Sequence, residues 1–289
     1  MQVSMPYLKL AGRAFGMTFG HFSLWAVMLI LGIIQAVIQS ILGSTTALAS
    51  IINMVISFIF TAALTAALIA MVDELAENKP VSIGSGFLAA LAFMPRLLGV
   101  LLLVALPSWV LLFLTAGGSF AAILSSGLGQ PGGVTVASLS SLLGSFSLML
   151  IANLLLSLIM GAIAVGAERA VVIEKAGLMA AMQRGWFLLT DYLGNFIVLG
   201  LILILFSVTG ALLIGGIFSV LLAGILSGSF NFLNILITIP ITLVIGGFFT
   251  IFFSCIWTLA FRFWQGKDDA APVVSPAPTV SGGMAPPRS

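Results

Sequence analysis

The side chains able to do acid–base, metal or nucleophilic chemistry are few in this chain. Its 289 residues include eight Asp or Glu, one His and one Cys. The carboxylates fall mainly into two groups, one of Asp73, Glu74 and Glu77 and the other of Glu168, Glu174 and Asp191. Paired carboxylates can bind a metal or act as acid and base. Lysines and arginines are interleaved with both groups and no histidine accompanies them, so structural salt bridges are favoured and no metal or cofactor is predicted.

The remaining reactive residues form no recognisable set. His21 is alone at the edge of an apolar stretch, where a solvated role is more common than a ligand role. Cys255 lies in an apolar run, so the sequence predicts neither a disulfide framework nor a cysteine-based metal site. There is no P-loop, HExxH or CxxC motif. We therefore predict no catalytic residue, and the chain is not expected to be an enzyme.

The distribution of charge along the chain indicates the kind of fold that holds these residues in place. All ten Lys or Arg and all eight Asp or Glu fall within residues 9–13, 73–96, 168–191 and 262–288. Charged residues make up 6% of the chain and hydrophobic residues 61%, whereas soluble domains are about 25% charged. The pattern predicts an all-α, polytopic membrane protein that lies in a lipid bilayer. No basic run exists that would indicate a nucleic-acid partner.

Six transmembrane helices are predicted between the charged segments, arranged as three hairpins. Each needs about 20 apolar residues, and suitable stretches lie near 22–42, 50–72, 97–115, 143–167, 193–216 and 234–261. Residues 217–226 extend the fifth stretch, either as part of a tilted helix or as a separate helix at the outer surface. The six spans form one membrane domain, residues 1–265, and the Pro-rich residues 266–289 are expected to be a disordered tail.

An even number of spans places both termini and all charged segments on one side. Because Lys and Arg favour the cytoplasmic side, we predict cytoplasmic termini, and a multi-pass protein of the bacterial inner membrane. The first apolar stretch is too long for a signal peptide and is interpreted as a retained span.

A semi-polar segment precedes each hairpin, at residues 7–15, 85–96 and 178–191. The apolar periodicity predicts interfacial helices, although each segment could instead be a cytoplasmic extension of the span that follows. A shift of 95 residues aligns Asp73 with Glu168 and Leu106 with Leu201. This alignment indicates a tandem internal repeat whose copies share one orientation.

Polar side chains inside the predicted spans are amides and hydroxyls rather than charges. The amides are Gln35, Gln39, Asn53 and Asn153. Hydrogen bonds between helices are their favoured role, and lining a substrate cavity is the alternative.

One stretch carries a family resemblance. Residues 168–177 are followed by an Ala-x-x-Arg-x-Trp helix and by a span that begins at Leu193. This resembles a pattern in uncharacterised bacterial six-span membrane proteins, which are often grouped with the membrane domain of some glycerophosphodiester phosphodiesterases. Its motif residues here are Glu168, Arg169, Glu174, Gly177, Arg184 and Trp186, and Lys175 stands where the pattern usually has Gly.

The resemblance implies the six-span architecture. It does not imply phosphodiesterase activity, because the hydrolase's metal-binding domain is missing. We predict a non-enzymatic membrane scaffold or accessory subunit, with a membrane-protein partner or further copies of itself. The alternatives are a permease or lipid-handling transporter with a polar-lined cavity and, less favoured, an interfacial membrane enzyme.

Overall fold

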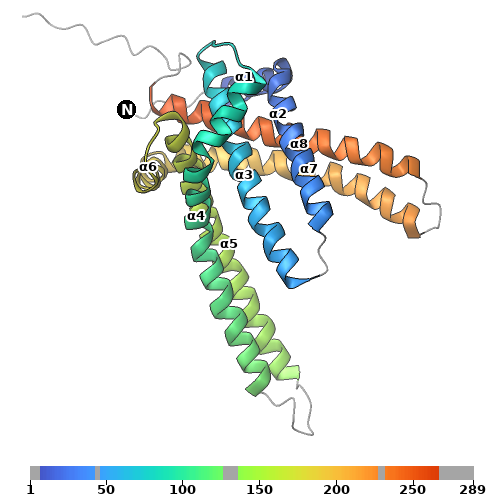
Figure 1. Ribbon diagram of the computed structural model, residues 1–289. Helices are drawn as coiled ribbons and strands as arrows, with labels where there is room; N and C mark the ends of the chain where they lie inside the picture. Colours follow the sequence, from blue (N-terminus) through green and yellow to red (C-terminus); the bar gives the residue numbers. More distant parts are fainter. Residues whose placement is uncertain (1–6, 43–45, 126–135, 227–231, 267–289) are drawn as a thin grey trace, which may run out of the picture.

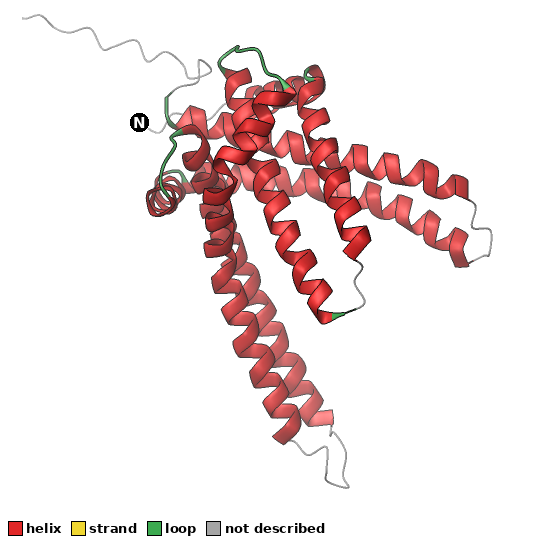
Figure 2. Ribbon diagram, viewed as in Figure 1, coloured by secondary structure: helices red, strands yellow, loops and turns green. Residues whose placement is uncertain are grey.

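The structure, a computed structural model, describes residues 7–42, 46–125, 136–226 and 232–266. Those residues form helices joined by short turns and no strand (Figure 2). The helices are α1 (Tyr7–Gly20), α2 (Phe22–Leu42), α3 (Ala47–Ala76), α4 (Ile83–Ser125), α5 (Val136–Ile173), α6 (Leu178–Asp191), α7 (Leu193–Leu226) and α8 (Phe232–Trp264). The all-α prediction is confirmed. The Pro-rich segment lies outside the described residues from position 267 onward.

Six of these helices are long and apolar enough to cross a membrane, namely α2, α3, α4, α5, α7 and α8. The prediction of a multi-pass membrane protein with six spans is therefore confirmed. Helix α2 has the predicted bounds of the first span, and the other five helices extend beyond the predicted spans by a few to more than ten residues. Residues 217–226 continue α7, so the interpretation of them as a separate outer helix is wrong.

The segment before the third span also differs from the prediction. Residues 85–96 are the start of α4 rather than a separate interfacial helix, as the alternative interpretation had it. The reason is visible at Ser82 and Ser85, where each backbone N–H donates to the other residue's hydroxyl, at 3.3 and 3.1 Å. This reciprocal cap starts the helix, and α4 then continues through Pro95 without a break. Helices α1 and α6 are separate, as predicted.

The three hairpins meet at one end and diverge toward the other (Figure 1). The α4–α5 and α7–α8 pairs point in different directions, and the α2–α3 pair lies between them. The core occupies the end where they meet. Its largest fully buried side chains include Leu68, Met71, Phe252, Leu259 and Phe261. Apolar side chains farther along the hairpins are exposed, as expected where lipid replaces water as the solvent.

The short helices α1 and α6 pack beside the meeting end. Helix α6 lies against α5 with Ala181, Gly185 and Leu188 buried, and it exposes Met179 and Trp186. The buried residues follow the helical repeat of 3.6. The large apolar side chains of Met179 and Trp186 are thus on an exposed side of α6, because small residues such as Gly185 make the contact with α5.

Candidate functional site

The carboxyl-terminal ends of α3, α5 and α8 meet where the hairpins converge. Each helix end carries a partial negative charge from its unpaired carbonyl groups. Acidic residues at two of these ends add to that charge: Asp73 and Glu77 at the end of α3, and Glu174 just after α5. A cation near this point is therefore favourable, and Arg262 in the last turn of α8 supplies one.

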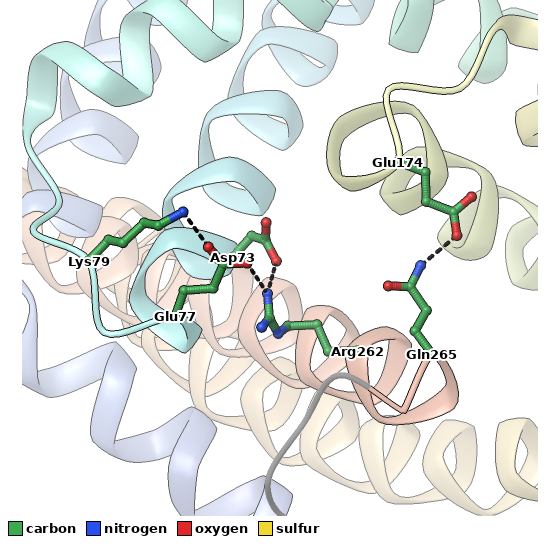
Figure 3. A network of polar contacts seen from close by, with 6 residues as sticks. All are labelled: Asp73, Glu77, Lys79, Glu174, Arg262 and Gln265. Atoms are coloured by element: carbon green, nitrogen blue, oxygen red, sulfur yellow. Dashed lines mark hydrogen bonds and ion pairs between the residues drawn. The ribbon is translucent and has the colours of Figure 1, made fainter.

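Arg262 connects α8 to the end of α3 (Figure 3). Its Nη1 donates to an oxygen of Asp73 and, at 3.2 Å, to Oε1 of Glu77. The arginine is buried, at 6% exposure. The other carboxylate oxygen of Glu77 lies 2.5 Å from Nζ of Lys79. Lys79, Glu77 and Arg262 therefore form a row of alternating charges that links the end of α3 to α8.

These contacts shift the pKa values of Glu77 and Lys79, which lie just beyond the span that ends at Ala76. The hydrogen bond from Lys79, together with that from Arg262, holds the pKa of Glu77 below its ordinary value. The same hydrogen bond with Glu77 raises the pKa of Lys79. Both shifts favour the charged forms of Glu77 and Lys79.

Gln265, directly after the end of α8, makes the corresponding contact with the turn that follows α5. Gln265 Nε2 donates to Oε1 of Glu174 at 2.5 Å, and Arg184 Nε from α6 donates to the same oxygen at 3.2 Å. Figure 3 shows Arg262 directed to the α3 turn and Gln265 to the α5 turn. Arg262 in the last turn of α8 and Gln265 directly after that helix thus join two turns that are far apart in sequence.

The two turns share a local geometry. Glu77 precedes Asn78 and Glu174 precedes Lys175, and both following residues have a φ of 56°. Asparagine is one of the few non-glycine residues enriched in this left-handed region, whereas lysine is strained there by about 1–2 kcal/mol. The carbonyl of Lys175 accepts a hydrogen bond from Arg96 Nη1 at 3.4 Å. That contact connects the second turn to α4.

Two motif residues form a pair within α5. Arg169 Nη1 donates to Glu168 Oε2 and to the carbonyl of Val165, each at 3.0 Å. Arg169 is 4% exposed, and its Nε has no hydrogen-bond partner among the described residues. The interaction is between sequence neighbours, so it adds no connection between helices.

The remaining motif residues belong to α6. Gly177 is the residue before its first turn, and its carbonyl accepts from the N–H of Ala181 at 2.8 Å. Trp186 points outward and is 51% exposed. Gly185, between Arg184 and Trp186, packs closely against α5: a Cβ at this position would lie 2.3 Å from the carbonyl oxygen of Ile163. Helix α6 therefore crosses α5 at backbone contact.

The span amides divide between two places. Gln35 Nε2 donates to the hydroxyl of Ser57 at 3.2 Å, which joins α2 to α3. Gln39 and Asn53 line a pocket of about 420 Å³ near that bond, with contributions from α2, α3 and α4. Asn153, on α5, does not line this pocket. The structure therefore brings Gln35, Gln39 and Asn53 together and leaves Asn153 elsewhere.

Sequence reasoning missed Arg262, Gln265 and Gly185. Arg262 was recognisable only as the last charge before the Pro-rich segment, and Gln265 and Gly185 gave no signal that distinguished them from similar residues. The acidic groups were recognised, but their partners on α8 were not. Among the described residues, no cluster of three His, Cys, Asp or Glu is placed to hold a metal ion. What the geometry provides is a set of interhelical contacts.

Comparison with known protein families, with curated proteins and with solved structures finds no match for this chain.

Proposed function

We propose that this protein is a non-enzymatic membrane scaffold or accessory subunit, whose diverging hairpins receive a transmembrane segment of a partner. The observation that carries this proposal is a groove of about 600 Å³ between α5 on one side and α7 and α8 on the other. The helices that line it belong to the α4–α5 and α7–α8 pairs, which point in different directions (Figure 1), and to α6.

The groove has the chemistry of a helix-packing surface. Its lining is almost entirely apolar and includes Leu158, Ile204, Phe253 and Trp257. Gly161 and Gly200 also line it, and small residues allow helix backbones to approach closely within a membrane. Leu158 and Ile204 are 54% and 51% exposed. A surface of this kind suits a second apolar helix better than a polar solute.

The polar cluster supports the same role. Asp73, Glu77 and Glu174 are occupied by contacts with Arg262, Gln265, Lys79 and Arg184. Such contacts hold three hairpins together at one end. A scaffold needs this rigidity, because the angle between hairpins determines the width of the groove.

Site-specific photo-crosslinking in the native membrane tests the proposal. A photoreactive residue at Ile204 should crosslink to one protein, either a partner or a second copy of this chain. Leu212 is the matched control, since it is on the same helix, is 72% exposed and does not line the groove. Crosslinks to lipid alone at both positions would contradict a partner-binding scaffold.

A hydrolysis assay separates the scaffold from the interfacial enzyme. The purified protein should not hydrolyse phospholipid. Hydrolysis that is abolished by Glu174→Ala, in a variant that still folds, would overturn the proposal.

A lipid-handling transporter is the second candidate, and the pocket beside Gln39 favours it. Ser57 and Thr61 add hydroxyls to its lining, so a polar group could be held within the apolar hairpins. Lipid flux in proteoliposomes that is lost in Gln39→Leu would support this function. Flux that is absent in the wild-type protein would count against it.

We further propose that both termini are cytoplasmic and that the protein belongs to the bacterial inner membrane. All Lys and Arg lie on the side that the positive-inside rule assigns to the cytoplasm. Membership of the six-span family suggested by residues 168–186 remains part of this proposal. The matching turns at Glu77 and Glu174, each contacted by α8, support an internal repeat.

A further inference from the structure

One face of α3 carries a row of polar side chains inside the membrane-spanning region. Asn53, Ser57 and Thr61 follow one another at intervals of four residues, and residues at that spacing share a side of a helix. Together with Gln39 from α2 they line the pocket of about 420 Å³ described above. All four belong to helices that can cross a membrane. The polar row therefore lies where lipid rather than water is the solvent.

Two of these polar groups have hydrogen-bonding capacity to spare. Ser57 accepts a hydrogen bond from Gln35 at 3.2 Å, which fixes its hydroxyl between α2 and α3. The amide of Gln39 and the hydroxyl of Thr61 make no hydrogen bond to any residue that the structure describes. A polar group without a partner is costly in hydrocarbon, because no water replaces the missing bond. A ligand that brings a hydrogen-bonding group to this depth is therefore favoured.

The lining also determines the charge of such a ligand. Within the described part of the chain, no Asp, Glu, Lys, Arg or His lines this pocket. A charged headgroup would be buried there without a counter-charge, at a much higher cost than a neutral one. Amides and hydroxyls both donate and accept hydrogen bonds. The matching ligand group is an uncharged one that does the same, and a hydroxyl is the simplest.

A second pocket continues the first along α4. It has a volume of about 470 Å³ and an apolar lining, and Met54 and Phe58 of α3 line both pockets. Leu102, Leu106 and Trp109 extend it along α4, and all three side chains are exposed. Polar and apolar pockets thus meet at the same two residues. This arrangement matches a molecule with a polar end and a hydrocarbon chain.

We propose that these adjoining pockets bind a neutral lipid whose headgroup carries a hydroxyl, as diacylglycerol does. The hydroxyl lies against Gln39, Ser57 and Thr61, and one acyl chain lies in the apolar pocket between α3 and α4. The site does not depend on the scaffold role. It gives a ligand class to the pocket on which the second candidate function rests, and it is tested by binding rather than by flux.

The test uses the full chain in phosphatidylcholine nanodiscs, with native mass spectrometry to count the retained lipid. One sample contains diacylglycerol and another contains the same lipid with its hydroxyl capped by an acetyl group. Diacylglycerol should be retained about fivefold better, which corresponds to about 1 kcal/mol for one hydrogen bond. Phosphatidylglycerol, which has hydroxyls and a negative charge, should be retained less well than diacylglycerol. Equal retention of the free and capped lipids, or a preference for phosphatidylglycerol, would overturn the proposal.

Isosteric variants assign the binding to the polar row. Thr61→Val removes the hydroxyl and keeps the shape, so it should lower retention of diacylglycerol about fivefold and leave the capped lipid unchanged. Unchanged retention of the capped lipid also shows that the variant folds. Thr209→Val is the matched control, because Thr209 is an exposed threonine in another span whose hydroxyl donates to the carbonyl of Leu205. Equal effects of the two variants would refute the assignment.

A steric variant tests the apolar half of the site. Ala105 lines the second pocket, so Ala105→Leu should fill it and lower retention of the free and capped lipids alike. Ala152→Leu is the control, since Ala152 is exposed on another span and lines neither pocket. No effect of Ala105→Leu would contradict the position of the chain. Because crosslinking at Ile204 reports on a different groove, a failure there leaves this site standing, and binding without flux excludes the transporter alone.

Discussion

Replacement of Arg262 by methionine should loosen the end at which the hairpins meet. Methionine keeps most of the aliphatic length of the side chain and removes its charge. Asp73, whose side chain is 21% exposed, then loses its charged hydrogen-bond donor. Glu77, at 36% exposure, keeps Lys79 as a partner.

The expected cost follows from these two contacts. A hydrogen bond to a charged group contributes about 1.5–3 kcal/mol, and we apply this to the largely buried Asp73. The contact with Glu77 is discounted to at most about 1 kcal/mol, because solvent screens exposed pairs. The free energy of local opening should therefore fall by about 1.5–4 kcal/mol.

The single cysteine provides the assay. Cys255 is fully buried on α8, and its sulfur lies 4.0 Å from the hydroxyl of Thr18 on α1. A thiol reagent can reach it only after local opening. At about 1.4 kcal/mol per factor of ten, the labelling rate in Arg262→Met should rise between about 12-fold and about 700-fold. The double variant Asp73→Asn with Arg262→Met should label more slowly than Arg262→Met alone, because the carboxylate left without its donor is also removed.

The matched control is Arg96→Met, which removes an exposed arginine that, among the described residues, donates to the backbone carbonyl of Lys175. It should leave the labelling rate of the cysteine near that of the wild type. If Arg262→Met also labels at the wild-type rate and unfolds at the same denaturant concentration, the contact does not hold α8 to α3 and the reasoning is refuted.

Three further predictions concern packing, backbone and charge. Gly185→Ala should lower the unfolding temperature markedly, because its Cβ would collide with a backbone carbonyl, whereas Gly194→Ala, with open space around it, should not. Lys175→Gly should stabilise the protein by about 0.5–1 kcal/mol in denaturant unfolding, the relief of left-handed strain less the added chain entropy; Lys175→Ala should give no such gain. Glu77 has a lowered pKa in the folded state, chiefly from its hydrogen bond with Lys79, so its contribution to stability is complete above about pH 5 and is lost as pH falls through that lowered pKa. The stability difference between wild type and Glu77→Gln should therefore shrink below about pH 5, and a difference that grows there would contradict the assignment.

The spans were predictable because hydropathy and length depend on local sequence. The first span is the clearest case, since His21 and the polar residues after Leu42 bound it on both sides. The start of the third was not predictable in the same way. An amphipathic pattern over residues 85–96 fits both an interfacial helix and an extension of the span, and the serine cap at its start favours the extension.

The break between α6 and α7 was predicted, but its cause lies in tertiary contacts. Tyr192 separates the helices, its ring stacks on Trp264 at 5.6 Å, and its hydroxyl donates to the carbonyl of Trp264 at 3.5 Å. The partners of the acidic groups depend on contacts of the same kind. Arg262 is 189 positions from Asp73, and several lysines and arginines nearer in sequence were equally plausible partners.

The location of Arg262 has a consequence for the order in which the protein assembles. Domains and helices emerge from the ribosome in sequence order, so the acidic ends of α3 and α5 enter the membrane surface before the arginine is made. Until α8 is inserted, Asp73 lacks Arg262 and Glu174 lacks Gln265, while Lys79 and Arg184 are already present as partners of Glu77 and Glu174. Completion of the last span is then the event that locks the bundle, and a nascent chain that stops before it leaves Asp73 without its arginine and the ends of α3 and α5 without the contacts that join them to α8.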